Sequence, residues 1–209
     1  MDWAELIIGA GPKDWRHSRF RGLHLWTVVH GTKEAAETRA ATDADLLRSL
    51  TPGTLLVAVG PGAAGKSTFA STEAVPHGMT VVCLDTLRHE ISGDAGDQSV
   101  TAPAVEQQNA LLESHLSSGR SVFLDSTNVE TRVRSTLVER ARRHGRPAVA
   151  MRFLVHLDIC RARNRRRQSN REVRDDVLVW QHEQMLAARP QALLAEGFTA
   201  AHDVAVSIP

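Results

Sequence analysis

From residue 54 onward, short apolar runs alternate with longer segments in which apolar and polar residues are mixed. Short continuous apolar runs are typical of strands that are buried on both faces of a sheet. Strands of this kind are predicted at 54–59, 80–84, 121–124 and 148–155, with a further candidate at 203–208. Helical spacing and glycine stops predict helices that begin near Lys66 and that span 102–118, 130–144, 158–167 and 171–188. This alternation predicts an α/β fold in which helices flank a parallel sheet.

The first fifty residues follow a different pattern. They hold three of the four tryptophans, namely Trp3, Trp15 and Trp26. They also hold a strand-like run at 23–29 and a helical run at 42–50, after which a Thr-Pro-Gly turn interrupts the chain. We therefore expect an N-terminal extension of unknown role over 1–52, packed on a main domain over 53–209. A tag or a partner-binding arm is the alternative.

Composition narrows the class of protein. With 209 residues, of which 42% are hydrophobic and 23% charged, the chain resembles an ordinary globular domain. The two cysteines, Cys83 and Cys160, are too few for a disulfide scaffold and favour a reducing compartment. No apolar run reaches the ~18 residues of a membrane span, and the start of the chain does not read as a secretory leader, so we expect a cytoplasmic protein without a membrane partner. A net charge of +1 does not by itself predict binding to nucleic acid.

Residues 60–67 match the phosphate-binding pattern GxxxxGK[ST] between a predicted strand and a predicted helix. Small residues let backbone N–H groups surround an anion, and the N-terminal end of the next helix favours the same negative charge. In such a loop Lys66 binds the β- and γ-phosphates of a nucleotide, and Ser67 provides an oxygen to Mg²⁺. The predicted nucleotide-binding residues are Gly60, Gly62, Ala63, Ala64, Gly65, Lys66, Ser67 and Thr68. The alternative is a tight strand–helix turn with a surface lysine.

The second predicted strand ends at an acid, Asp85, which Arg88 follows three residues later. Ligands bind beyond the carboxyl ends of parallel strands, so Asp85 is expected where an acceptor approaches the γ-phosphate. A carboxylate there can accept the proton of an acceptor hydroxyl, and an arginine on the same helical face can hold an anionic part of the acceptor. The alternative is that Asp85 caps a helix and Arg88 is solvated.

The third predicted strand ends in the same way, at Asp125-Ser126-Thr127-Asn128. An acid at the end of an apolar strand is typical of a position that holds Mg²⁺ directly or through water. The small polar residues after it are candidates for contact with the acceptor. They also suit the start of the helix that follows, which is the alternative role.

Seven arginines lie between residues 161 and 174. Arginines on a helical lid, here over about 158–175, can close over a triphosphate and neutralise its charge. Arg163 and Arg167 are four residues apart and are predicted to face the same way, with Arg171 near the start of the next helix. A solvated basic helix or a nucleic-acid patch is the alternative.

Five segments together resemble the kinase module of bacterial and phage polynucleotide kinases, the P-loop kinases of RNA end-healing enzymes. They are GPGAAGKST at 60–68, DTLR at 85–88, GDQSVT at 96–101, DSTN at 125–128 and the lid-like stretch at 160–173. The resemblance covers about residues 54–205 and implies a P-loop kinase fold around a central parallel sheet. It also implies transfer of the γ-phosphate of ATP, with Mg²⁺, to the 5′-hydroxyl end of RNA or DNA.

The resemblance further implies roles for particular residues. Those acting on the transferred phosphate or the acceptor hydroxyl would be Lys66, Asp85, Arg88, Arg163 and Arg167. Of these, Asp85 would be the general base, and the two lid arginines would neutralise the γ-phosphate. Oxygens near the metal would come from Ser67, Asp85 and Asp125. The acceptor groove would be lined by Arg88, Asp97, Gln98, Val100, Thr101, Thr127 and Asn128.

Two departures from that family are visible. One extra residue separates Arg167 from Arg171, and the chain holds no phosphatase or ligase module, so the resemblance implies separate end-repair proteins as partners. Two other functions fit the same phosphate loop. One is phosphorylation of a hydroxyl on a small molecule, such as an antibiotic, a sugar or a nucleoside. The other is nucleotide-dependent regulation without catalysis. No pattern in the sequence predicts the oligomeric state.

Overall fold

The computed structural model describes residues 43–205, and its centre is a five-stranded sheet in which every pair of neighbouring strands is parallel. The strands are β1 (Leu55–Val59), β2 (Thr80–Cys83), β3 (Val122–Asp125), β4 (Ala148–Leu154) and β5 (Ala200–Ala205). Their order across the sheet is β2-β3-β1-β4-β5. The predicted parallel α/β fold is therefore confirmed, and β1, the most apolar strand, lies in the middle.

The last strand begins earlier than the sequence predicts. We expected it at 203–208, whereas β5 starts at Ala200 and pairs with β4 from the register Val149↔Ala200 onward. The reason is tertiary, because the Thr199 backbone N–H and hydroxyl both donate to the Ala148 carbonyl at the entry to the strand pair. The end of the predicted run lies outside the described residues.

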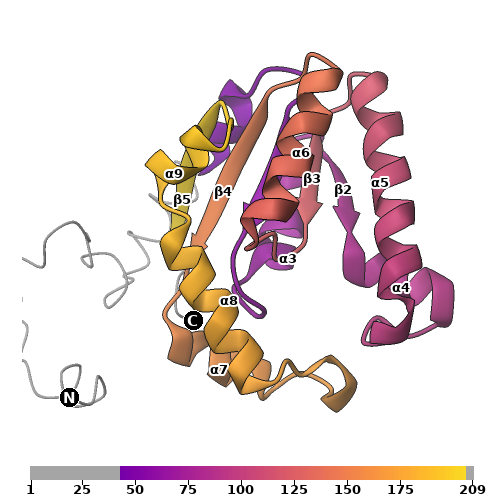
Figure 1. Cartoon of the computed structure of the whole chain (residues 1–209), viewed down its shortest axis with the longest axis vertical. Helices are drawn as coiled ribbons and strands as arrows, with labels where there is room; N and C mark the ends of the chain where they lie inside the picture. The colour runs from indigo at the N-terminus through magenta and orange to yellow at the C-terminus, as the bar shows by residue number, and fades with distance from the viewer. Residues whose placement is uncertain (1–42, 206–209) are drawn as a thin grey trace, which may run out of the picture.

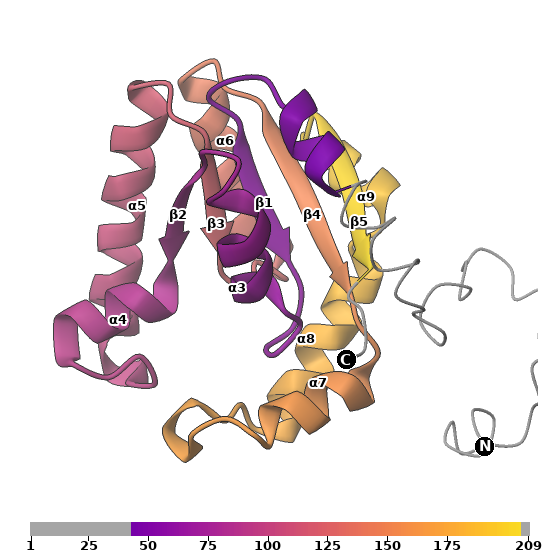
Figure 2. The same ribbon diagram turned by 180° about the vertical axis from the view of Figure 1, so that it is seen from behind.

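Helices cover both faces of the sheet (Figures 1 and 2). They are α3 (Lys66–Phe69) with its π-helical continuation η3 (Ala70–Ala74), α4 (Leu84–Ser92), α5 (Thr101–Ser117), α6 (Thr131–Arg143), α7 (Leu157–Asn164), α8 (Asp175–Ala187) and α9 (Pro190–Ala195). Two short 3₁₀ turns, η4 (Gln98–Val100) and η5 (Ser169–Arg171), precede α5 and α8. The predicted helices near Lys66, at 102–118 and at 130–144 are confirmed to within a residue or two at each end.

The arginine-rich region is less helical than predicted. We expected helices at 158–167 and 171–188, but α7 ends at Asn164 and α8 begins only at Asp175. The intervening residues 165–174 form a loop that contains η5. The Asn164 side chain bonds to the main chain of Val173, and such side-chain bonds compete with the regular helical ladder.

Two apolar layers hold the helices to the sheet. Alternate residues of β1 point to opposite faces, as strand geometry requires. Leu55, Val57 and Val59 join the layer under α5 and α6, and Leu56 and Ala58 join the layer under α3 and α7. In the second layer Phe69 of α3 packs against Phe123 and Phe153, with ring centroids 5.5 and 5.6 Å apart.

The helical run expected at 42–50 is present from residue 43 to 49, and it belongs to the core. Leu47 is buried in the second apolar layer, and Leu46 and Leu50 pack against the same layer. The predicted strand-like run at 23–29 and the three early tryptophans lie outside the described residues. In the described part of the chain, each helix is too short or too polar to cross a bilayer.

Because the strands are parallel, the segments that follow β1, β2, β3 and β4 all leave from one edge of the sheet. Figures 1 and 2 show α4 on one side of this edge and the loop between α7 and α8 on the other. Parallel sheets bind their ligands at this edge, so the fold brings the predicted phosphate loop, both strand-end acids and the arginine-rich loop to one place.

Candidate active site

The phosphate loop joins β1 to α3 and closes around the Lys66 side chain. Lys66 is buried, and its Nζ donates to the carbonyl oxygens of Gly60 and Pro61 at 3.1 and 2.6 Å. The turn into α3 is made by Gly65, whose φ of 97° is in the left-handed region that favours glycine. The loop is thus wrapped around a cation at the N-terminal end of a helix, which is the arrangement that an anionic phosphate chain requires.

Burial makes the charge on Lys66 costly. The pKa of its ammonium is lowered from the ordinary value of 10.5 to about 8, mainly because burial penalises the charged form. Nearby Asp125 acts in the opposite direction and favours the charged form, although its effect is the smaller one. A phosphate chain placed beside Lys66 would add negative charge and favour the ammonium further.

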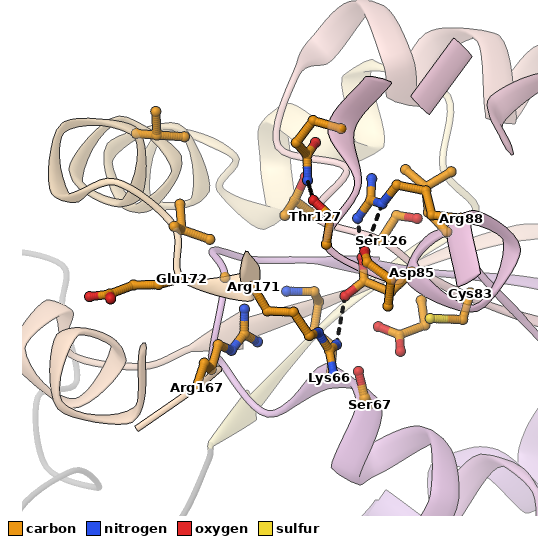
Figure 3. Close-up of a pocket in the computed structure, with 18 of the residues that line it drawn as sticks. Lys66, Ser67, Cys83, Asp85, Arg88, Ser126, Thr127, Arg167, Arg171 and Glu172 are labelled. Atoms are coloured by element: carbon orange, nitrogen blue, oxygen red, sulfur yellow. Dashed lines mark hydrogen bonds and ion pairs between the residues drawn. The ribbon is translucent and has the colours of Figure 1, made fainter. Parts of the chain in front are cut away.

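Asp85 lies between two arginines. It is in the first turn of α4, and its Oδ1 accepts from Arg88 one turn later on the same face. Its Oδ2 accepts from Arg171 Nη2 across the cleft at 2.9 Å. Arg88 is itself almost buried and is fixed by a bond from its Nε to the Ala95 carbonyl at 3.0 Å. Figure 3 shows this carboxylate held between the two guanidinium groups, on the side of the cleft opposite Arg167.

Asp125 ends β3 beside Cys83 of β2, so it lies at the same edge of the sheet as Asp85. It is buried, it lines the same cleft as Lys66 and Ser67, and it is the largest favourable influence on the Lys66 ammonium. Of the residues after it, Ser126 and Thr127 line the cleft.

Asn128 has a different environment from the one expected of an acceptor contact. It is buried with a φ of 46°, and its Nδ2 donates to the Ala58 carbonyl of β1 at 2.8 Å. The neighbouring Thr127 carbonyl accepts from the Gly60 N–H at 2.9 Å. These two bonds lock the segment after β3 against the start of the phosphate loop, so Asn128 has a structural partner here.

These segments surround a cleft of about 510 Å³. The predicted residues on its wall are Gly62, Lys66, Ser67, Asp85, Arg88, Gln98, Asp125, Thr127 and Arg167. Other predicted residues are not on the wall: Gly60, Ala63, Ala64, Gly65, Thr68, Asp97, Val100, Thr101, Asn128 and Arg163. Asp97 instead accepts from the N–H and hydroxyl of Ser99, which lowers the pKa of its carboxyl group.

The arginine-rich loop supplies one wall of the cleft. Arg167 and Arg171 both line it, and Figure 3 shows them on the same side as Lys66. Burial lowers the pKa of the Arg167 guanidinium, and the positive charge of Arg171 lowers it further. Because burial and a neighbouring positive charge both disfavour the charge on Arg167, an anion placed beside this guanidinium would be favourable.

Several residues on the cleft wall are not among the predicted site residues. Gln181 of α8 accepts from the Gly62 N–H at 2.8 Å, and Val173 packs against the same glycine. Asn170 and Gly96 are also on the wall and contact each other. Gly96 stands in the GDQSVT segment, and Asn170 and Val173 stand in the lid-like stretch at 160–173, both of which pointed to this region. Gln181 lies in neither segment and is brought to the cleft only by the packing of α8.

The parallel sheet, the phosphate loop at its centre and the flanking helices define a P-loop kinase-like α/β fold. A family model for AAA domains (AAA_33) matches residues 55–192, which is more than half of the chain, and the chain belongs to this family. No curated protein matches the chain.

Solved structures share this fold at low sequence identity. The AvrRxo1-ORF1:AvrRxo1-ORF2 complex with sulphate ions is 18% identical, with a TM-score of 0.55 over 77% of this chain and 56% of that chain. Chaetomium thermophilum Kti12 in complex with ADP-AlF3 is 20% identical, with a TM-score of 0.50 over 72% and 88%. A chain of the Pnkp1/Rnl/Hen1 complex is 22% identical, with a TM-score of 0.47 over 57% and 40%. The chain therefore spans only about half, or less, of the AvrRxo1 and Pnkp1-complex chains. The likenesses to the AvrRxo1 complex and to Kti12 describe the fold alone.

Proposed function

We propose that this protein is an ATP-dependent phosphotransferase that phosphorylates the 5′-hydroxyl end of RNA or DNA. One observation carries the proposal. The Asp85 carboxylate, paired with Arg88, opens onto the same cleft as Lys66 and Ser67 of the phosphate loop. A base for a hydroxyl proton and a cradle for a triphosphate thus line one cavity, which is the arrangement that phosphoryl transfer by positioning requires.

In the proposed reaction the phosphate loop and Lys66 hold the β- and γ-phosphates of ATP. The acceptor oxygen attacks the γ-phosphorus, its proton passes to Asp85, and the bond from the γ-phosphorus to the β-phosphate oxygen breaks to release ADP. Arg167 neutralises charge on the transferred group, and Arg163 remains a proposed helper from the end of α7. Since Arg171 occupies one oxygen of Asp85 in the free protein, it must move away from that oxygen, toward the phosphates, before the carboxylate accepts the proton.

The cleft also fits Mg²⁺, which would neutralise phosphate charge when bound. Ser67 and Asp125 are oxygen donors on one wall and would hold the ion, and we keep Asp85 as a third proposed donor. Within residues 43–205, no group of three or more His, Cys, Asp or Glu side chains forms a metal cage. Mg²⁺ commonly takes only one or two protein carboxylates together with phosphates and water, so this donor set is sufficient.

The acceptor side supports an anionic substrate. Arg88 lines the cleft and is held in place by the bond from its Nε to the Ala95 carbonyl. A guanidinium group binds a phosphate oxygen pair well, so a nucleotide phosphate next to the reacting sugar suits Arg88. Gln98 and Thr127, which both line the cleft, would contact the rest of the acceptor. Asp97, Val100, Thr101 and Asn128 remain proposed contacts on the basis of the resemblance alone.

A small-molecule hydroxyl is the second candidate acceptor. The observation in its favour is the size of the cleft, since about 510 Å³ is within the range of pockets that enclose small ligands.

We also propose that the protein is located in the cytoplasm, because Cys83 and Cys160 are both unpaired. As partners we propose end-repair proteins.

The test is incubation with γ-labelled ATP and a panel of 5′-hydroxyl oligonucleotides, nucleosides, sugars and aminoglycosides. We expect label on the 5′ end of an oligonucleotide, with kcat/KM falling steeply as salt rises because phosphate contacts release counterions. Lys66→Ala and Asp85→Ala should each remove transfer, and Asp45→Ala, which breaks an exposed ion pair that is not on the cleft wall, should not. Label on a small molecule alone, without salt dependence, would favour the second candidate, and no label on any acceptor would contradict both.

A further inference from the structure

Asn164 is the last residue of α7 and one of the few buried polar side chains among residues 43–205. Its carboxamide makes two hydrogen bonds to a single residue. Nδ2 donates to the Val173 carbonyl at 2.7 Å, and Oδ1 accepts from the Val173 N–H at 3.1 Å. Both polar groups of the side chain and both polar groups of the Val173 main chain are therefore satisfied by this one contact.

This contact is not an ordinary helix cap. A capping side chain bonds to the ends of its own helix, whereas Asn164 reaches nine residues ahead, past the whole loop. It ties the end of α7 to the residue just before α8 and so closes the loop 165–172. That loop carries Arg167 and Arg171, the two arginines on the cleft wall.

Val173 in turn is docked on the phosphate loop. A Cβ added to Gly62 would lie 3.1 Å from Cγ2 of Val173, so the two are already in close contact. Gln181 of α8 fixes the same glycine by accepting from its N–H at 2.8 Å. The contact with Gly62 thus fixes Val173 against the phosphate loop. Because Asn164 is bonded to Val173, the two ends of the arginine loop are held at the same place.

We infer that Asn164 is a positioning residue, which through Val173 sets where Arg167 and Arg171 lie over the phosphate loop. It touches neither the cradle nor the Asp85 carboxylate. Its effect on phosphate binding rests on the proposed function, whereas its effect on the loop itself does not. Removing the carboxamide frees one end of the loop and leaves the backbone polar groups of Val173 without that partner, while every group on the cleft wall remains.

The first test needs no catalysis. The loop contains Arg165, Arg166, Arg167 and Arg171, after which trypsin cleaves, so its opening is measured by the rate of cleavage there, with sites identified by mass spectrometry. We expect Asn164→Ala to speed cleavage within 165–174 by about tenfold or more, as the lost bonds raise the population of open loop. Asn109→Ala is the matched control. The side-chain oxygen of Asn109 in α5 accepts a hydrogen bond from Arg140 in α6, so this variant also loses an asparagine side-chain bond, but one outside the arginine loop. It should leave cleavage in the loop unchanged.

The second test measures ATP. For Asn164→Ala we expect Kd and KM for ATP to rise about tenfold with the KM for the acceptor unchanged, since two arginines lose their positions at the phosphates. Asn164→Asp is nearly isosteric and keeps the acceptor oxygen for the Val173 N–H, but it sets a carboxylate oxygen against the Val173 carbonyl. Asn164→Asp should therefore not restore the affinity for ATP. Because this variant preserves the shape of the side chain, it replaces Asn164→Ala in the test if Asn164→Ala does not fold.

Cleavage of the loop at the wild-type rate in both Asn164 variants would overturn the inference, and so would an effect on ATP binding no larger than that of Asn109→Ala. These outcomes are separate from a failure of the proposed function. If the wild-type protein labels no acceptor, the proteolysis and the direct measurement of ATP binding still decide the role of Asn164.

Discussion

Lys66 is a buried cation whose ammonium group already donates to two loop carbonyls, so the phosphate loop is preformed around it. The same burial brings the pKa of Lys66 to about 8, within the range of ordinary assay buffers. A group that must be charged to bind phosphate and that is neutralised near pH 8 makes binding depend on pH.

We therefore expect the affinity for ATP to be nearly constant below about pH 7 and to fall by up to about tenfold per pH unit above pH 8. The sign follows from the lowered pKa, since rising pH removes the proton from free Lys66 while bound phosphate favours the charged form. Equilibrium binding of ATP between pH 6.5 and 9.5 measures this. In Lys66→Arg, where the charge persists at every pH tested, the decline above pH 8 should disappear even if affinity is lower.

At the scale of elements, several segments are positioned by buried side chains rather than by their own propensity. Arg134 of α6 is buried, and its Nε and Nη2 donate to both oxygens of Glu196 at 2.7 Å. Its Nη1 donates to the carbonyls of Asn128 and Val129. One side chain thus joins α6, the end of α9 and the segment after β3 that braces the phosphate loop.

Removing this arginine should be strongly destabilising. We expect Arg134→Ala to cost about 3–5 kcal/mol, because it leaves Glu196 as a largely buried charge without its partner. The double variant Arg134→Met with Glu196→Leu should recover most of that loss. Urea unfolding measures both, and Arg142→Ala, which breaks an exposed pair with Glu139, should cost no more than about 1 kcal/mol. A loss in Arg134→Ala as small as in that control would contradict the role given to the network.

The two sides of the cleft also touch at their outer edge. The Asp94 Oδ1 accepts from the Gly96 N–H and from Asn170 Nδ2, both at 2.8 Å. A Cβ added to Gly96 would lie 2.2 Å from the Asn170 carbonyl oxygen. Because this oxygen belongs to the main chain, the clash could be relieved only if the backbone moved. Gly96 is therefore required by the close approach of the arginine loop.

We expect Gly96→Ala to push the arginine loop away from the segment after α4. Peptide-level hydrogen exchange should then show faster exchange over 165–174, with stability otherwise changed by no more than about 1–2 kcal/mol. Asp94→Ala, which removes the two bonds without adding bulk, should have a smaller effect of the same sign. Unchanged exchange in Gly96→Ala would mean that the two sides do not rest against each other in solution.

The two helices predicted at 158–167 and 171–188 show where local sequence patterns no longer suffice to predict the secondary structure. Arginine is a good helix former, so the arginine-rich residues 165–167 and 171–174 favour helix by their local sequence. The structure instead places a loop there, because the carboxamide of Asn164 bonds to the main-chain groups of Val173 and because Asn170 of the loop packs against Gly96. These contacts are between residues that no helical or strand period relates.

For the whole molecule, the open question left by the sequence is where the folded core begins. The predicted boundary near residue 52 separates an extension from the main domain, and this division remains a prediction. The helix at 43–49 nevertheless contributes Leu47 to the layer that also holds Phe69, Met151 and Phe153. The segment just before the boundary is therefore part of the packed core.

We expect Leu47→Ala to lower the free energy of unfolding by about 2–4 kcal/mol, the usual cost of removing a buried leucine side chain. Leu194→Ala, at a leucine that is 48% exposed on α9, should change it by no more than about 0.5 kcal/mol. Thermal or urea unfolding of the full chain measures both. Equal, small effects would place residues 43–50 outside the cooperative core.

The sequence by itself determined the parallel α/β fold, the phosphate loop and the acids that follow β2 and end β3. The loop and the acids depend on a few consecutive residues, and the fold depends on the alternation of strand and helix patterns along the chain. The tertiary structure alone decided how these parts meet. The order β2-β3-β1-β4-β5 sets β1 between β3 and β4, and no period in the sequence encodes strand neighbours that are not consecutive. The pairs Arg171–Asp85 and Gln181–Gly62 join residues 86 and 119 positions apart, so they exist only once the sheet edge has brought both chain segments to one cleft.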